Sequence, residues 1–212
     1  MSEQDWLTLL RRHKAIAVIR TPSVPIGYQL AQAVASGGIR FIEITWNSTN
    51  PGKMVQQLRK ILPECIIGAG TLMNSSQVTE AINSGAQFLF SPHTNPQLIQ
   101  QAIAANIPMI PGALTPTEIT TAWQAGASCV KVFPIQAVGG VNYIRALQGP
   151  LGQIPLIPTG GVTLDNAANF IGAGACGVGL SSQLFPRHLI AREDWQAIAN
   201  NARNLVDSLK TL

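Results

Sequence analysis

Short apolar runs, four to seven residues long, recur at a regular spacing along the chain. Runs of this length predict buried β-strands, and the segments between them carry the three- and four-residue apolar spacing of α-helices. The expected strands are residues 15–19, 39–45, 65–69, 87–90, 107–110, 128–133, 154–157 and 176–179. The clearest expected helices are residues 26–35, 54–62, 78–82, 98–104 and 119–125, and the first dozen residues predict an extra N-terminal helix.

Glycine marks the junctions between the expected helices and strands. Gly37, Gly85, Gly126 and Gly174 each lie where a helical segment ends and a strand is about to begin, which suits the left-handed backbone of a helix end. Regular alternation of strands and helices predicts a parallel α/β fold and favours a closed (β/α)8 TIM barrel. No GxGxxG string directly follows an expected strand, which weakens the alternative of an open nucleotide-binding sheet. The whole chain, residues 1–212, is expected to form one barrel domain.

Composition limits the class of protein. Of the 212 residues, 46% are hydrophobic and 11% are charged, so the chain is long enough for one large core and is not expected to be disordered. No apolar stretch reaches the roughly 18 residues of a membrane span, and the N-terminus does not resemble a secretory signal, so no membrane partner is expected. Cys65, Cys129 and Cys176 lie in apolar segments without a CxxC pair, which indicates core thiols and a cytoplasmic location.

The charge pattern argues for a small anionic ligand. The net charge is +4 at pH 7, but Lys and Arg are scattered and aromatic residues are few, so no nucleic-acid partner is expected. A carboxylate or a phosphate fits better. His13, His93 and His188 are not at ligand spacing, so no metal site is expected.

Two charged residues interrupt the apolar strands. Glu43 alternates with the aliphatic residues Ile42 and Ile44, and Lys131 alternates with Val130 and Val132. Because aliphatic side chains suit the helix-facing side of a strand, we expect both charged side chains to point into the barrel. An ammonium group is costly to bury without a partner, so such a lysine favours the free amine, which is the nucleophile of Schiff-base chemistry on a carbonyl carbon. Glu43 would then shuttle protons.

Two simpler interpretations stay open at this point. Lys131 would also fit a side chain that reaches solvent at the end of its strand. Lys131 and Glu43 would also fit a structural ion pair, although buried pairs seldom stabilise a fold more than apolar replacements would.

Polar and glycine-rich segments follow several expected strands. The string ending at Thr71 offers backbone N–H groups and a hydroxyl suited to a carboxylate, although a plain glycine turn would have the same sequence. Thr159, Gly160 and Gly161 follow the seventh strand and Ser182 follows the eighth, where barrels of this kind often bind phosphate. The sequence therefore predicts an anion site at the carboxyl ends of the strands.

Eight strings, in order and nearly all at expected strand ends, span most of the chain: AVIR, GGIRFIEIT, IIGAGT, GAQFLFSP, IPGALTPTE, KVFP, PTGGV and GLSS. Together they resemble the pyruvate-dependent class I aldolases that cleave 2-keto-3-deoxy-6-phosphogluconate (KDPG) and 4-hydroxy-2-oxoglutarate (KHG). The resemblance implies a homotrimer of (β/α)8 barrels with no metal and no cofactor. Its substrate would be a small keto acid, phosphorylated in the case of KDPG, and its products pyruvate with glyceraldehyde 3-phosphate or glyoxylate.

The resemblance also implies a role for each matching residue. Lys131 would form the Schiff base, Glu43 would act as acid and base, and Thr71 would bind the carboxylate of the pyruvyl group. Pro92 and Phe133 would line the pocket. The residues implied to hold the phosphate or the polar end of the substrate are Thr159, Gly160, Gly161 and Ser182.

One position departs from the family pattern. A Thr-Leu-Arg-Thr string usually follows the glutamate, whereas this chain has Thr-Trp-Asn-Ser, with Asn47 in place of the arginine that helps to hold substrate. Losing a bidentate cation weakens the expected grip on an anionic group. Arg20, at the end of the first strand, is a candidate to compensate.

Two other functions remain alternatives at this stage. A phosphosugar isomerase or epimerase would share the phosphate-site signals, but it would not need a buried lysine. A non-catalytic protein that binds a keto acid or phosphate would show ligand-induced stabilisation without product release, and Asn47 keeps this alternative open.

We expect Asn47→Arg to lower the KM for phosphorylated keto acids, because the variant restores a cation that pairs with an anionic group. Steady-state kinetics of pyruvate release would measure the change. An unchanged or raised KM would show that a missing cation does not limit this site.

Overall fold

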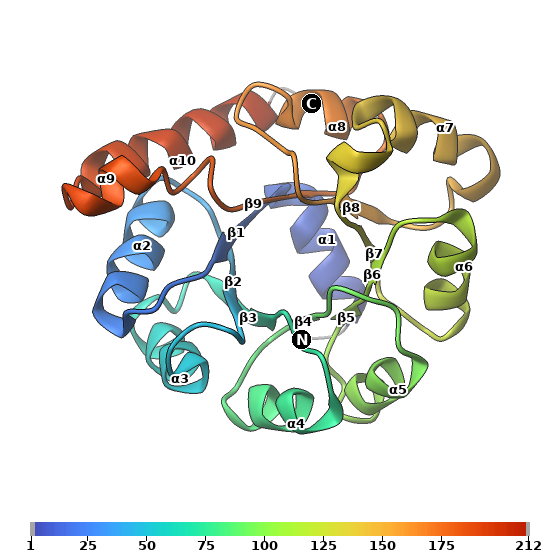
Figure 1. The fold of residues 1–212 in the computed structure, drawn as a ribbon, viewed down its shortest axis with the longest axis horizontal. Helices are drawn as coiled ribbons and strands as arrows, with labels where there is room; N and C mark the ends of the chain where they lie inside the picture. The colour runs from blue at the N-terminus through green and yellow to red at the C-terminus, as the bar shows by residue number, and fades with distance from the viewer. Residues whose placement is uncertain (1–2, 211–212) are drawn as a thin grey trace.

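In the computed structural model, which describes residues 3–210, parallel strands alternate with helices (Figure 1). The strands are β1 (Ala15–Ile19), β2 (Phe41–Thr45), β3 (Ile66–Gly70), β4 (Leu89–Phe90), β5 (Met109–Ile110), β6 (Gly112–Ala113), β7 (Val130–Val132), β8 (Leu156–Pro158) and β9 (Val178–Leu180). The helices are α1 (Glu3–His13), α2 (Val24–Ser36), α3 (Pro51–Ile61), α4 (Ser75–Asn83), α5 (Pro96–Ala104), α6 (Pro116–Gln124), α7 (Val141–Leu151), α8 (Ala167–Gly172), α9 (Arg187–Ala191) and α10 (Trp195–Lys210), with a 3-10 helix η1 (Ile135–Val138).

The strands form two parallel sheets. One has the order β5-β4-β3-β2-β1-β9 and the other the order β6-β7-β8. Only Pro111 separates β5 from β6, and an isolated parallel bridge joins Thr159, directly after β8, to Gly179 of β9. Figure 1 shows the strands around a common centre with most of the helices outside them. The fold is therefore α/β with parallel strands, as the alternating pattern predicts.

Each expected strand overlaps an observed one, and the five expected helices correspond to α2 to α6. The fifth strand continues past its expected end, but it is divided at Pro111, which has no N–H to give to a ladder. Gly85 (φ 84°), Gly126 (φ 91°) and Gly174 (φ 102°) adopt the expected left-handed backbone, whereas Gly37 (φ −76°) does not and Gly38 (φ 100°) does so after α2 instead. No helix within residues 3–210 combines the length and apolar character that crossing a membrane requires.

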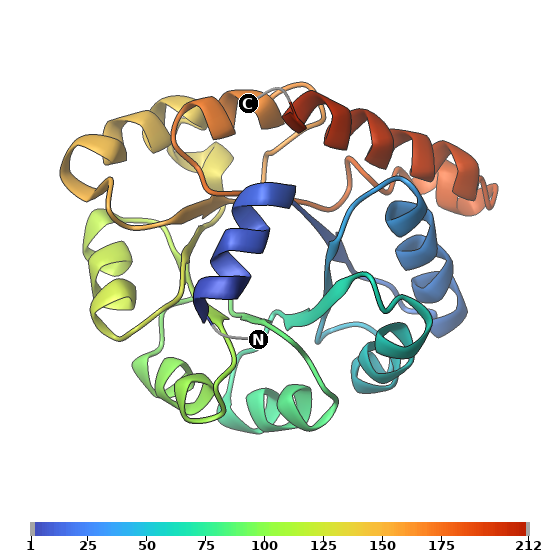
Figure 2. The same ribbon diagram turned by 180° about the vertical axis from the view of Figure 1, so that it is seen from behind.

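The pleat of the strands divides the apolar side chains into two clusters. Phe41 and Cys129 belong to the inner cluster, whereas Ile42 and Val130 belong to the larger outer cluster that the helices cover. This is the alternation that the sequence predicts. Trp6 of α1 packs edge-on against Phe41, with 5.7 Å between ring centroids. Because Phe41 begins β2, α1 covers the amino ends of the strands, and Figure 2 shows it lying across them.

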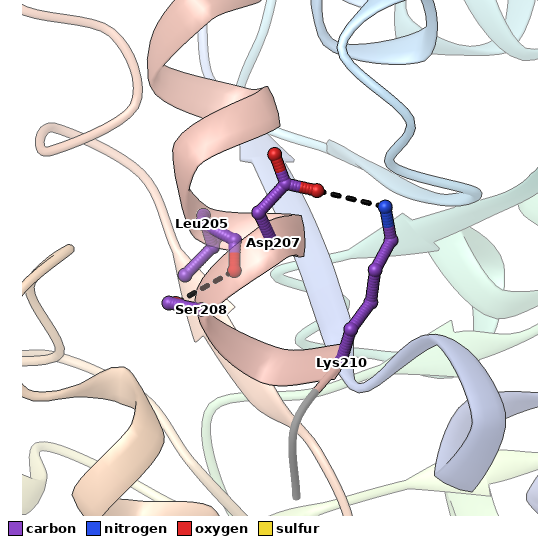
Figure 3. A network of polar contacts seen from close by, with 4 residues as sticks. All are labelled: Leu205, Asp207, Ser208 and Lys210. Carbon is purple, nitrogen blue, oxygen red and sulfur yellow. Dashed lines mark hydrogen bonds and ion pairs between the residues drawn. The ribbon is translucent and has the colours of Figure 1, made fainter.

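The C-terminal helix α10 packs against α2. An added Cβ at Gly37, the C-cap of α2, would lie 2.6 Å from Cβ of Ala202, so the two helices meet closely there. Figure 3 shows the end of α10, where Lys210 Nζ pairs with Asp207 Oδ1 at 2.7 Å and Ser208 Oγ donates to the Leu205 carbonyl at 2.8 Å. An exposed ion pair of this kind contributes at most about 1 kcal/mol. Packing, and not this pair, holds α10 in place.

Gly68 of β3 shows how tightly the inner layer is packed. An added Cβ at this position would overlap the ring of Phe88, so the ring lies directly on the β3 backbone. Phe88 in turn contacts Trp6, Phe41 and Phe90. A side chain at residue 68 would therefore displace the centre of an aromatic cluster.

We expect Gly68→Ala to destabilise the protein by about 1–3 kcal/mol, the usual penalty for overpacking a core. Gly172→Ala in α8 is the matched control, since nothing lies within 4 Å of its added Cβ. Alanine should leave the stability unchanged or raise it by at most about 1 kcal/mol. Urea unfolding followed by circular dichroism would measure both changes, and a neutral Gly68→Ala would contradict the packing argument.

Candidate active site

A cavity of about 340 Å³ opens at the carboxyl ends of the strands, opposite α1. Every residue that the sequence predicts for the site lines it, except Asn47. These lining residues are Arg20, Glu43, Thr71, Pro92, Lys131, Phe133, Thr159, Gly160, Gly161 and Ser182.

Lys131 lies in the middle of β7 and is only 6% exposed. Its Nζ lies 5.0 Å from the ring centroid of Phe133 and 5.5 Å from that of Phe90. Within residues 3–210 it has no ion-pair partner, and Glu43 does not form one with it. The structural ion pair is therefore not formed, and the burial of Lys131 does not fit a side chain that extends into solvent. Lys131 lines the cavity, and its amine lies near both aromatic rings.

Glu43 of β2 is 1% exposed, and its Oε1 has no hydrogen-bond partner within the described residues. Burial raises the pKa of Glu43, and the positive charges of Lys131 and Arg20 offset part of that rise. A carboxyl group with a raised pKa exchanges its proton closer to neutral pH than an exposed glutamate does. Glu43 is therefore able both to donate and to accept a proton beside the amine of Lys131.

Gly70, at the end of β3, makes the space that the Glu43 side chain occupies. An added Cβ at Gly70 would overlap the Glu43 carboxyl group. The two glycines of the IIGAGT string thus accommodate side chains from neighbouring strands, Phe88 at Gly68 and Glu43 at Gly70. The sequence indicated only their exposed backbone, because the side chains that need the space come from other segments.

Thr71 follows Gly70 and lines the cavity with a left-handed backbone (φ 57°). This conformation is rare for a β-branched residue and costs about 1–3 kcal/mol. The next residue, Leu72, is anchored, because its N–H donates to the Phe90 carbonyl at 3.1 Å. Thr71 is thus held at the cavity wall by the backbone on both sides.

The loops that follow β1 and β2 are joined by hydrogen bonds. Arg20 Nε donates to Asn47 Oδ1 at 3.2 Å, and Thr21 N donates to Ser48 Oγ at 3.1 Å. Thr49 N donates to the Thr21 carbonyl at 3.1 Å. Asn47 therefore contacts Arg20 instead of the cavity. Within residues 3–210 the terminal amino groups of Arg20 have no protein partner, which leaves them available to an anionic ligand.

Two glycines shape the far wall of the cavity after β8. Gly160 (φ 78°) and Gly161 (φ 117°) both have a left-handed backbone. An added Cβ at Gly160 would lie 2.9 Å from the Phe133 ring, so the chain passes directly beside that ring. Ser182 approaches the same wall from the loop after β9. The wall offers backbone groups and hydroxyls without a charged side chain.

Metal ligands do not gather in the part of the chain that the structure describes. Residues 3–210 contain no group of three or more His, Cys, Asp or Glu side chains placed to hold an ion. His93, which the sequence places after the fourth strand, does not line the cavity. Its Nδ1 is buried and has no hydrogen-bond partner among these residues.

A family model described as KDPG and KHG aldolase matches residues 7–201. The chain belongs to the KDPG and KHG aldolase family. Among its relatives, the 2-dehydro-3-deoxy-phosphogluconate aldolase of Haemophilus influenzae is 34% identical over 98% of both chains. The KHG/KDPG aldolase of Escherichia coli K12 is 30% identical over 98% of this chain and 99% of its own.

A solved structure of the KDPG aldolase from Legionella pneumophila has a closely similar fold. It superimposes with a TM-score of 0.86 and 27% identity, over 94% of this chain and 97% of its own. That structure holds pyruvate captured as a covalent carbinolamine intermediate.

The cavity of this family member also has lining residues that sequence reasoning missed: Val18, Val162, Gly179 and Ser181. Val18 lies two positions before Arg20 on β1, so strand alternation was a sufficient signal for it. Gly179 lies in the GLSS string, but its own segment does not indicate which side chain it accommodates. An added Cβ there would lie 2.6 Å from Thr159 Oγ1, a contact between strands that are distant in sequence.

Glu43→Gln tests the electrostatics of the site, because the variant removes the titrating group and keeps the shape. Burial raises the pKa of Glu43, so folding favours its protonated form and wild-type stability falls as pH rises above about 4.3, the value for an unfolded glutamate. The variant lacks this decrease, so its free energy of unfolding, relative to that of wild type, should increase as pH rises. Each unit of pKa difference corresponds to about 1.4 kcal/mol. Urea unfolding at several pH values would measure this change. A difference in unfolding free energy between variant and wild type that stays constant with pH would contradict the prediction.

Proposed function

We propose that this chain is a class I aldolase that cleaves a 2-keto-4-hydroxy acid into pyruvate and an aldehyde. The observation that carries the proposal is the buried amine of Lys131, which faces the cavity without an ion-pair partner in the described chain, near the buried carboxyl group of Glu43. The carbinolamine in the Legionella pneumophila relative supports the same chemistry here.

In the proposed reaction, Lys131 Nζ attacks the C2 carbonyl carbon of the substrate and forms a carbinolamine. Glu43 donates its proton to the departing water, which leaves an iminium ion and a Glu43 carboxylate. That carboxylate takes the proton of the C4 hydroxyl as the C3–C4 bond breaks. The bonding electrons move into the iminium, so the aldehyde departs and an enamine remains.

The second half of the reaction returns both residues to their starting states. Glu43 protonates C3 of the enamine, which gives the iminium of pyruvate. Water then adds to C2, and the C2–Nζ bond breaks with proton transfer through Glu43. Pyruvate leaves, and the amine of Lys131 is restored. The raised pKa of Glu43 suits this alternation between donor and acceptor near neutral pH.

The substrate is proposed to be KDPG, KHG or both, in line with the two relatives named above. Thr71 and the free amino groups of Arg20 would bind the carboxylate, with Asn47 positioning Arg20. Pro92 and Phe133 would line the reacting centre. The distal phosphate or carboxylate would lie against Thr159, Gly160, Gly161 and Ser182.

We also propose that residues 1–212 form a single closed (β/α)8 barrel domain in which α1 is an additional helix that covers the amino ends of the strands. The bridge between Thr159 and Gly179 and the single residue between β5 and β6 support closure. Residues 1–2 and 211–212 lie outside the described chain. A homotrimer is proposed from the family resemblance, and a cytoplasmic location from the cysteines in apolar strands, without a nucleic-acid or membrane partner.

The other two candidate functions make different use of the site. A phosphosugar isomerase would have no use for an amine buried near Phe90 and Phe133. A non-catalytic binding protein would not need Gly70 to hold space for a buried Glu43 whose pKa is raised by burial. Both features favour the aldolase.

The deciding experiment is borohydride trapping with pyruvate, followed by intact-mass and peptide mass spectrometry. We expect one reduced pyruvyl adduct on Lys131, absent without pyruvate and absent in Lys131→Arg, which keeps the charge but has no attacking amine. Lys53 is an exposed residue of α3, so Lys53→Arg is the matched control and should trap pyruvate normally. No adduct on folded wild type in excess pyruvate would refute the Schiff base. An adduct without cleavage of either hydroxy-keto acid would favour a binding protein.

A further inference from the structure

A second cavity, of about 540 Å³, adjoins the one that contains Lys131. The two cavities share Gly161, Val162 and Ser182 as lining residues, so they meet at the wall where the distal end of the substrate is proposed to lie. Pockets that hold small molecules measure about 300–1,000 Å³, and each of these cavities reaches that size alone. The site therefore has more room than the cleavage of a short keto acid requires.

The second cavity differs from the first in charge. The first is lined by Arg20, Glu43 and Lys131. No Asp, Glu, Lys, Arg or His of the described chain lines the second. An anionic group in this cavity would lose water without meeting a positive side chain, whereas an uncharged group would lose less.

Uncharged hydrogen-bonding groups of the second cavity are available to a ligand. The side chains of Gln136, Ser182 and Gln183 line it and make no hydrogen bond with other protein groups within residues 3–210. By contrast, Thr163 and Asn166 are mutually satisfied, because Thr163 N donates to Asn166 Oδ1 at 2.7 Å and Asn166 N donates to Thr163 Oγ1 at 3.1 Å. Two free amides and a hydroxyl suit the alternating donors and acceptors of sugar hydroxyls.

The backbone keeps this cavity open on its outer side. Gly139 and Gly140, which precede α7, have nothing within 4 Å of an added Cβ. Phe170 and Val141 contribute apolar surface. A cavity with apolar walls and a few polar groups that fix orientation is the usual form of a small-molecule site.

We propose that the second cavity binds the uncharged, hydroxylated tail of a 2-keto-3-deoxy sugar acid whose chain extends beyond the sixth carbon. This inference rests on the proposed function, in which C2 of the substrate bonds to Lys131 and its distal end lies against the wall that includes Gly161 and Ser182. Because those two residues also line the second cavity, a chain that extends beyond that wall enters it. Cleavage then releases pyruvate and a hydroxylated aldehyde longer than three carbons.

The test compares kcat/KM for an eight-carbon 2-keto-3-deoxy sugar acid that ends in a free hydroxyl with kcat/KM for KHG. We expect Gln136→Leu and Gln183→Leu each to lower the ratio of the long to the short substrate by about three- to tenfold, the usual effect of one lost hydrogen bond. Gln153→Leu is the matched control, because Gln153 lies at another cavity, beside Arg11 and Lys14. It should leave the ratio unchanged.

Three results would overturn the inference. The first is that the wild-type enzyme cleaves KHG but not the eight-carbon acid. The second is that the ratio of kcat/KM for the long and the short substrate stays constant in both variants. The third is that KDPG loses more than the eight-carbon acid in the variants, which would assign the cavity to the phosphate. Pyruvate trapping on wild-type Lys131 separates these failures from failure of the proposed function, because a normal adduct would leave the aldolase mechanism standing. If no adduct forms, both the inference and the proposed mechanism are refuted.

Discussion

The constraint on which the site depends is that a lysine amine and a carboxyl group share one apolar interior without forming an ion pair within the described chain. Lys131 and Glu43 are both buried, and removing either charged form from water without a partner is unfavourable by several kcal/mol. The surroundings favour the uncharged carboxyl group, as the direction of the Glu43 pKa shows. The same cavity is therefore a poor place for a stabilising pair and a good place for proton transfer.

The neighbouring segments are built around this constraint. Gly70 leaves room for the Glu43 carboxyl group, and the rings of Phe90 and Phe133 both lie close to the amine. Thr71 keeps an unfavourable backbone angle at the cavity wall. The backbone angle of Thr71 and the unpaired Glu43 oxygen lower stability, and all of these features shape the space around the reacting atoms. Burial of the inner and outer apolar clusters provides the stability that makes these unfavourable features tolerable.

Strand periodicity was enough to predict much of this arrangement from the sequence. The alternation of Glu43 with Ile42 and Ile44 predicts that the carboxyl group points inside, and the structure agrees because a strand has only two faces. The bond from Arg20 to Asn47 could not be predicted in the same way, since it joins two loops whose approach depends on the pairing of β1 with β2. The role of Gly70 was hidden for a similar reason. A glycine that accommodates a side chain from a neighbouring strand has no signal in its own segment.

The contrast between the two cavities follows from where the fold places charge. Within the described chain, Arg20 is the one guanidinium that lines either cavity, and it lies on the same side of the fold as Lys131. A ligand with one carboxylate is therefore oriented by charge at one end, whereas its other end meets amides, hydroxyls, backbone groups and apolar surface but no charged side chain of the described chain. Charge steers an acid into the site, but it discriminates little among acids that all carry the same carboxylate. Discrimination then depends on the uncharged end, where a chain of matching length and hydroxylation bonds the free amides and a shorter or differently hydroxylated chain lacks those hydrogen bonds. In such a site, specificity is set far from the amine that performs the reaction.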